Sequence, residues 1–240
     1  MKTLAAPLLS YHGDPLVKAK YIARFAAHRS ADEVIQGKGF IEGRGCFVGC
    51  TLDAYDHSRF PSELGWPMWL AYLADTIFEG LPKTEAAQFG TDLLETVPVG
   101  VNLKAVENRF LLALQLRSLA RITRLKINGA NVFIASIKTV IKLLAKDVEP
   151  QSTAWSAAWS AALSAKKSSA WSNACLAAWS AAQSAAWSAS KSELQAASSA
   201  ASSAARSAKY VGATVFDDFA QTKEYQMQRD DLLVILKDCE

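Results

Sequence analysis

The chain has 240 residues, half of them hydrophobic and one fifth charged, with a net charge of +3. These values fit a compact soluble protein of one or two domains, and so small a charge does not favour a nucleic acid as its partner. Four cysteines are too few for a dense disulfide framework, and the first ten residues lack a small-residue cleavage site. We therefore expect a cytoplasmic protein with reduced cysteines and no signal peptide.

The first predicted helix begins at Pro15, because Asp14 is a favoured N-cap residue and proline suits the first helical position. We expect this helix to end near Arg29. The sequence Ser-Ala-Asp-Glu at 30–33 then has the pattern of a capping box. It predicts a second, short helix.

A glycine-rich segment follows at 37–50 and holds five of the chain's twelve glycines. We expect no helix there; two apolar pairs, at 40–41 and 47–48, predict a small hairpin around the intervening Glu-Gly-Arg-Gly. The glycines have two interpretations. They form only a tight turn, or they expose backbone N–H groups that bind an anion beside Lys38 and Arg44. The segment has neither the Walker pattern nor a dinucleotide-binding fingerprint.

Histidine, arginine and aspartate side chains gather in the first sixty residues, which contain all three histidines of the chain. The group consists of His12, Asp14, His28, Arg29, Arg44, Asp53, Asp56, His57 and Arg59. It favours a binding or catalytic site, although each residue can also be an ordinary surface group. Zinc ligation by Asp56, His57, Cys46 and Cys50, or a Cys46 nucleophile, is a weaker interpretation, because the spacing matches no known site. We predict no metal and no cofactor.

Helical signals continue after this group. Pro67 precedes a predicted helix over 68–79, in which the apolar residues have helical spacing. Thr84 is a candidate N-cap for a helix that ends near Thr96, and a break follows at 97–100. Two helices, one over 68–79 and one ending near Thr96, are thus expected before the middle of the chain.

The next region is predicted to be a basic helical hairpin, with helices over 103–125 and 131–146 joined by an Asn-Gly turn at 128–129. From 108 to 145 the chain has no aspartate or glutamate. The arginines that share one face of the first helix are Arg117, Arg121 and Arg124. This face is either an ordinary solvated surface or a cationic wall for a phosphate-bearing partner.

The most regular part of the chain is 152–208, where Ser-Ala-Ala-X repeats and X is often tryptophan. Alanine favours helix, and the stretch has no proline or glycine, so a helical segment is predicted. Four steps of about 100° overshoot one turn by about 40°, so the tryptophans wind around the helix. A central helix with different neighbours along its length, a right-handed supercoil and several shorter helices all satisfy this pattern. The tryptophans are expected to pack against protein, and the serines make the segment too polar to span a membrane.

The predicted fold is mainly all-α: a helical bundle with a small glycine-rich hairpin or loop near the N-terminus and a long Ala/Ser/Trp-repeat helical segment. Three regions are expected. Residues 1–100 form an N-terminal helical domain with the glycine-rich loop and the His/Arg/Asp cluster, 101–150 form the basic hairpin, and 151–240 form the repeat helices and a C-terminal helix whose apolar end is 231–237. These regions could also belong to one continuous domain.

Five blocks carry a resemblance: YHGD at 11–14, AHRSADE at 27–33, GRGCFVGCT at 43–51, YDHS at 55–58 and IFEGL at 77–81, followed by the Ser-Ala-Ala-Trp repeats. Together they resemble a family of uncharacterised proteins of phage and bacterial genomes over most of the chain. The repeat departs from the pattern at Lys167, Cys175, Gln183 and Lys191. The resemblance implies a phage context, in which small proteins often counter host defence systems that signal through cyclic nucleotides or cyclised ADP-ribose.

The leading hypothesis is therefore a homo-oligomeric protein of the host cytoplasm that binds and sequesters a small anionic nucleotide-type signal without turnover. Its predicted ligand-binding residues are Arg29, His28, Lys38, Arg44, His57, Arg59, Trp66 and Trp69. A phosphodiesterase-type hydrolase is the first alternative, with His12 or His57 as the acid or base and Asp14 or Asp56 orienting it. Arg44 would stabilise the charge that develops on the phosphate. A helical protein-interaction scaffold is the second. No membrane and no nucleic acid partner is expected.

Overall fold

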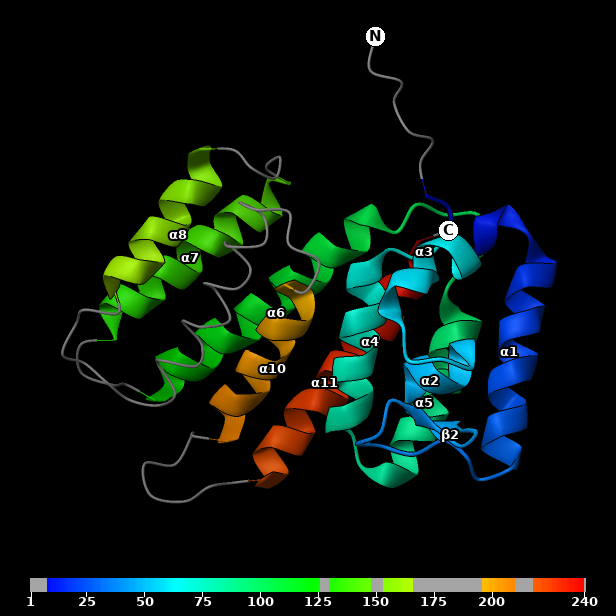
Figure 1. Cartoon of the computed structure of the whole chain (residues 1–240). Helices are drawn as coiled ribbons and strands as arrows, with labels where there is room; N and C mark the ends of the chain where they lie inside the picture. The colour runs from blue at the N-terminus through cyan, green and yellow to red at the C-terminus, as the bar shows by residue number, and fades with distance from the viewer. Residues whose placement is uncertain (1–7, 126–129, 148–152, 166–195, 210–217, 240) are drawn as a thin grey trace, which may run out of the picture. The chain divides into compact units, whose positions relative to one another are not determined.

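The structure is a computed structural model that describes residues 8–125, 130–147, 153–165, 196–209 and 218–239 (Figure 1). Within these ranges the protein is mainly α-helical, as predicted, and its strands form one short antiparallel hairpin. None of the helices described there combines the length and the apolar character that a membrane crossing requires. The chain divides into two units, one comprising Met1–Val106 and Leu232–Glu240 and the other Glu107–Asp231.

The first unit surrounds a short buried helix with longer ones. Its elements are η1 (Ser10–Gly13), α1 (Pro15–Ser30), β1 (Phe40–Ile41), β2 (Arg44–Gly45), α2 (Phe47–Leu52), η2 (His57–Arg59), α3 (Phe60–Leu64), α4 (Met68–Gly80) and α5 (Lys83–Thr96). Helix α2 contacts α1 and α4, and α5 contacts both of these longer helices (Figure 1). Every residue of α2 is buried, so this helix is the centre of the unit.

An aromatic core fixes α2 in place. The Trp66 ring is fully buried, with ring centroids of Tyr11, Phe47 and Phe60 5.7 to 6.5 Å away. Large rings bury much apolar area each, so this cluster contributes a large share of the hydrophobic stabilisation of the unit. Packing from several sides therefore holds α2 in place.

Local capping signals located most helix ends in this unit. Asp14 caps α1, since its Oδ1 accepts a hydrogen bond of 2.8 Å from the Leu16 N–H. Helix α4 begins directly after Pro67, as predicted. Thr84 does not cap α5, because the N-cap position belongs to Pro82 and the helix has already begun at Lys83. The predicted end of α5 at Thr96 is correct.

Two predictions near the hairpin were wrong. The sequence at 30–33 does not start a helix: α1 ends at Ser30, and the Glu33 carboxylate bonds to His28 instead of capping a helix. Residues 47–48 are helical and not a strand, because they begin the buried helix α2. The hairpin itself is present, but its second strand is Arg44–Gly45, with Ile41 paired to Arg44.

The second unit is built from long helices. They are α6 (Lys104–Leu125), α7 (Asn131–Ala145), α8 (Thr153–Ala165), α10 (Ala196–Lys209) and α11 (Asp218–Lys237), of which α6 begins and α11 ends in the first unit. Helix α7 packs on α8, where Trp155 is 1 % exposed, in agreement with a packing role for this tryptophan. The predicted turn at 128–129 and the repeat residues 166–195 lie outside the described residues. The parts of the repeat that the structure describes are helical, in α8 and α10.

A buried ion cluster joins α6 to α11 in this unit. The Glu224 side chain is 1 % exposed and accepts hydrogen bonds from Arg117 and Arg121. Arg117 also pairs with Asp231, and Arg121 donates to the backbone carbonyl of Ala204 in the alanine-rich helix α10. Two of the three arginines on the predicted cationic face are therefore paired with carboxylates inside the unit.

Candidate functional site

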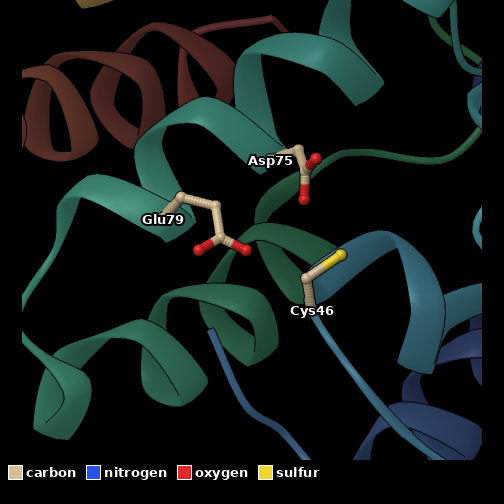
Figure 2. A group of neighbouring side chains, drawn as sticks. All are labelled: Cys46, Asp75 and Glu79. Atoms are coloured by element: carbon tan, nitrogen blue, oxygen red, sulfur yellow. The ribbon is translucent and has the colours of Figure 1, made fainter. Parts of the chain in front are cut away.

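A thiol and two carboxylates converge where α2 meets α4 (Figure 2). Cys46 is the N-cap residue of α2, and Asp75 and Glu79 lie one turn apart on α4, so their side chains share one helical face. One potential ligand atom from each residue lies within 4.8 Å of the others. We call these three residues the Cys46 cluster.

The hairpin places Cys46 through close backbone contacts. Its N–H donates to the carbonyls of Lys38 and Gly39, at 3.0 and 3.1 Å. A Cβ atom on Gly45 would lie 2.3 Å from the Gly39 carbonyl oxygen, so only glycine permits this approach. Cys46 is consequently held at the start of α2, where the whole residue is only 1 % exposed.

Asp75 is oriented by aromatic neighbours. Its Oδ2 accepts a hydrogen bond of 3.1 Å from the Tyr55 hydroxyl and lies 3.3 Å from His57 Nε2. The His57 ring in turn stacks on Tyr72, with 4.1 Å between centroids and 10° between planes. Among the residues that the structure describes, no nitrogen or oxygen donor bonds to the other oxygen, Oδ1, which is buried, and the Cys46 thiol hydrogen-bonds to the same carboxylate. Tyr55 and His57 therefore fix one oxygen of Asp75, and the carboxylate faces Cys46.

Glu79 is held in the same way from the other side. Its Oε2 accepts a hydrogen bond of 2.8 Å from the Gly37 N–H, and Gly37 has a φ of +80°, a conformation that favours glycine. Gln36 fastens the segment that precedes β1 to the end of α4, because its side-chain amide donates to the carbonyls of Phe78 and Leu81. Glu79 lies at the exposed rim of the cluster.

The surroundings of the Cys46 cluster favour protonation of its acidic groups or the binding of a cation. Burial raises the pKa of the Cys46 thiol, and the nearby Asp75 carboxylate raises it further. Burial also raises the pKa of Glu79, with a smaller contribution from Asp75, against the Gly37 hydrogen bond that lowers it. In the part of the chain that the structure describes, no lysine or arginine bonds to either carboxylate, and His57 is the one basic side chain in contact. Such a group can bind a divalent metal ion.

A second group of ionisable residues is bonded mainly to itself. His28 Nδ1 lies 2.6 Å from Glu33 and Nε2 lies 2.8 Å from Asp53, which also pairs with Arg24 at 3.1 Å. Burial alone would lower the pKa of His28, but the hydrogen bonds to Asp53 and Glu33 raise it above its ordinary value. Both ring nitrogens are used, so this network holds α1 to the end of α2.

Most of the predicted ligand-binding residues are engaged with other parts of the first unit. Trp66 and Trp69 are buried at 0 and 7 % exposure, so neither ring is available to stack on a ligand. Arg29 donates to Gln88 and Thr91 on α5. Arg59 pairs with Glu63, with 2.6 Å between Nε and Oε1. His28 belongs to the network described above.

Two predicted residues contact the Cys46 cluster. His57 contacts Asp75 directly, and the backbone carbonyl of Lys38 accepts a hydrogen bond from the Cys46 N–H. Lys38 and Arg44 are exposed, and the Arg44 guanidinium lies 3.4 Å from the Asp32 carbonyl. In sequence, these two cations flank the hairpin turn.

The candidate catalytic residues of the hydrolase alternative do not form one group. His12 is exposed, with its Nε2 3.1 Å from the Ser62 carbonyl, and Asp14 is the N-cap of α1. His57 is paired with Asp75 and not with its neighbour Asp56, which caps η2 by accepting from the Ser58 N–H. Only His57 lies beside the Cys46 cluster.

Sequence reasoning named Cys46 and His57 but missed Asp75 and Glu79. A signal for them exists: two carboxylates four residues apart interrupt an otherwise apolar predicted helix at 68–79. That spacing places both on one face, and a face with two acids on a largely buried helix needs a partner. The partner, Cys46, comes from a distant part of the chain.

No protein-family model, curated protein or solved structure matches the chain. The resemblance to a phage and bacterial family stays a prediction.

Proposed function

We propose that the first unit binds one divalent metal ion in the Cys46 cluster. The observation that carries this proposal is the convergence of one ligand atom each from Cys46, Asp75 and Glu79 within 4.8 Å. Thiolate and carboxylate groups gathered in this way are ligands for a divalent metal ion. Oδ1 of Asp75 is buried and accepts no hydrogen bond from a nitrogen or oxygen of the described residues, so a metal ion held by the three side chains would also satisfy this atom.

Electrostatic repulsion supports the same conclusion. Two unit negative charges 4.8 Å apart repel by roughly 3.5 kcal/mol at an effective dielectric constant of about 20. Three anions therefore cannot share the cluster unless protons or a cation compensate them. A divalent ion compensates two charges at once and accepts all three ligands, whereas each proton satisfies one side chain only.

A hydrolytic role is the second candidate, favoured by the position of His57. Three protein ligands leave a coordination position for water, and a bound metal lowers the pKa of that water enough to make hydroxide near neutral pH. His57 lies beside the ligand Asp75, where an imidazole can take up the proton of the water. The exposed cations Lys38 and Arg44 favour a phosphodiester as the substrate class, as the sequence-based alternative supposes.

Sequestration of an intact nucleotide-type signal remains a prediction, supported by the same two exposed cations. A metal-dependent hydrolase returns an altered ligand, whereas a sequestering protein returns it unchanged. Heat denaturation of protein purified from cells with an active nucleotide-signalling defence, followed by mass spectrometry of the released molecules, distinguishes the two.

Metal content tests the proposal directly. After removal of metals with a chelator, the full chain is dialysed against Zn²⁺, Co²⁺, Mn²⁺ or Mg²⁺ and the bound metal is measured by mass spectrometry. We expect about one ion per chain for at least one metal. Asp75→Asn and Glu79→Gln should each lower the affinity at least about 100-fold, because each removes a ligand, and Glu95→Gln, an exposed carboxylate on α5, is the matched control.

Wild-type protein that takes up none of the four metals contradicts the proposal. So do Asp75→Asn and Glu79→Gln variants that bind as tightly as the control. Hydrolysis is tested on the loaded protein with bis(p-nitrophenyl) phosphate: turnover that requires the metal and is lost in Asp75→Asn supports the second candidate, and its absence removes that candidate while metal binding stands.

A further inference from the structure

Two cysteines of the described residues, Cys46 and Cys50, are buried one helical turn apart, and their surroundings differ. Cys50 lies inside α2, where its Sγ is 3.3 Å from the Gly45 carbonyl and 3.8 Å from the Glu33 carbonyl. Those oxygens satisfy its thiol as a weak donor. Cys46 lies one turn earlier, at the N-cap, and its Sγ points toward Asp75 and Glu79 (Figure 2). One thiol is therefore an ordinary packed residue and the other faces carboxylates.

Both carboxylates are arranged to offer a single oxygen each. Tyr55 and His57 contact Oδ2 of Asp75, which leaves Oδ1 for a ligand, and the Gly37 N–H holds Oε2 of Glu79, which leaves Oε1. Calcium takes six to eight oxygens and often uses bidentate carboxylates, while magnesium demands near-octahedral oxygen ligands and keeps several waters. Two single oxygens and a sulfur fit neither ion well.

The same donor set suits a tetrahedral ion. Zinc binds thiolate at about 2.3 Å and carboxylate oxygen at about 2.1 Å, which places neighbouring ligands of a tetrahedron roughly 3.5 Å apart. The ligand atoms of the Cys46 cluster lie within 4.8 Å of one another, so side-chain rotations that move them by about 1 Å bring them to the spacing of a tetrahedral site. As sulfur coordinates, the thiol proton leaves to solvent and the thiolate becomes the ligand.

We infer that Cys46 is the ligand that determines which metal this centre takes, and that it selects a thiolate-binding transition metal of the Zn²⁺ or Co²⁺ type over Mg²⁺ and Ca²⁺. The inference rests on the proposed metal site and adds the class of metal. Soft sulfur donors select such metals, whereas carboxylates alone suit magnesium, calcium and manganese. Asp75 and Glu79 then supply charge, and Tyr55, His57 and Gly37 are positioning groups.

Cobalt spectroscopy of the full chain tests this inference. Metal-free wild-type protein is titrated with Co²⁺, which gives a sulfur-to-cobalt charge-transfer band in the near ultraviolet only when a thiolate is bound. We expect this band in wild type and in Cys50→Ser, the matched control, and its loss in Cys46→Ser. Zn²⁺ should remove the band by displacement, whereas a large excess of Mg²⁺ or Ca²⁺ should not.

A second variant reverses the preference. Cys46→Asp replaces sulfur by oxygen, so its affinity for Zn²⁺ relative to Mn²⁺ or Mg²⁺ should fall at least about tenfold. Wild-type protein that binds Co²⁺ without the charge-transfer band, or a band that survives in Cys46→Ser, overturns the role of Cys46 and leaves the metal site standing. Wild-type protein that binds no Co²⁺, Zn²⁺ or any other metal overturns both. A wild-type spectrum without the band overturns the role of Cys46 even if a variant fails to fold, and Cys46→Ala is the second variant that assigns the band if Cys46→Ser does not fold.

Discussion

Removing the charge of Glu224 should unfold the second unit at a markedly lower temperature. The Glu224 side chain is 1 % exposed and is held by Arg117, at 3.1 Å between Nη2 and Oε1, and by Arg121. The substitution Glu224→Gln keeps the shape but leaves two guanidinium groups without this carboxylate. Breaking a buried ion pair by neutralising one partner costs about 3 to 5 kcal/mol, because the other charge stays buried.

The lower end of that range applies here. Arg117 keeps Asp231 as a partner, Arg121 keeps the Ala204 carbonyl, and the arginine side chains are 21 and 15 % exposed, so water can solvate part of the remaining charge. We expect a loss of about 3 kcal/mol. For a chain of this size, that corresponds to a midpoint lower by roughly 6 to 12 °C.

Thermal and urea denaturation of the full chain, followed by circular dichroism, measure the effect. Asp230→Asn is the control, because Asp230 neighbours the cluster on α11 but is 61 % exposed, and an exposed pair is worth about 1 kcal/mol or less. A Glu224→Gln variant as stable as this control refutes the reasoning. The double variant Arg121→Met, Glu224→Met should recover part of the loss, since apolar residues can replace a buried pair at little net cost.

Two further predictions concern the first unit. Because the folded-state pKa of His28 is raised by Asp53 and Glu33, its contribution to stability is full below about pH 6.5 and is lost as pH rises through that raised pKa. The difference in melting temperature between wild type and His28→Gln should therefore shrink from pH 5.5 to 8.5, and a constant difference contradicts an ionised His28. Gly90→Ala should destabilise the unit by about 2 kcal/mol, because the new Cβ would lie 2.3 Å from the buried Phe25 ring and overpacking of up to about 3 kcal/mol exceeds the helix-propensity gain of about 1 kcal/mol. Chemical denaturation checks the sign, and a more stable variant refutes it.

Local signals predicted the parts of the fold that local interactions determine. Asp14 and Pro15 mark the start of α1 because an N-cap hydrogen bond spans two residues and needs no other element. The break after Thr96 likewise follows from the proline and glycine beside it. These predictions succeeded since the deciding contacts lie within one helical turn.

Contacts between distant segments decided the cases that failed. The capping pattern at 30–33 predicts a helix, but the Glu33 carbonyl accepts from the Gly45 N–H and its carboxylate binds His28, so both groups are used in other ways. Phe47 begins a helix despite its glycine-rich flank because the whole of α2 is buried among aromatic rings. Propensity is a weak prior, and tertiary packing overrides it here.

The candidate site shows the same division. Cys46 and His57 attract attention in the sequence because thiols and imidazoles are rare and reactive, whereas the spacing of Asp75 and Glu79 indicates only that they share one face of an apolar helix and names no partner. What makes them ligands is the approach of α2 to α4, which brings residues about thirty positions apart within 4.8 Å. No local pattern encodes that approach, so only the fold reveals the cluster.

The glycines of the segment 37–50 also have a packing role. Of the anion nest predicted at 43–45, the Gly45 N–H donates to the Glu33 carbonyl; beside it, the N–H of Gly37 donates to Glu79 and that of Cys46 to two carbonyls. A Cβ on Gly49 would lie only 2.1 Å from the Gly39 carbonyl oxygen. The glycines thus let the hairpin press against the start of α2, and this contact sets the position of Cys46. A dense glycine segment here builds the wall of a cation site, because its donors face carboxylates and carbonyls of the protein and its absent side chains let the backbone at Gly39 approach Gly45 and Gly49 closely.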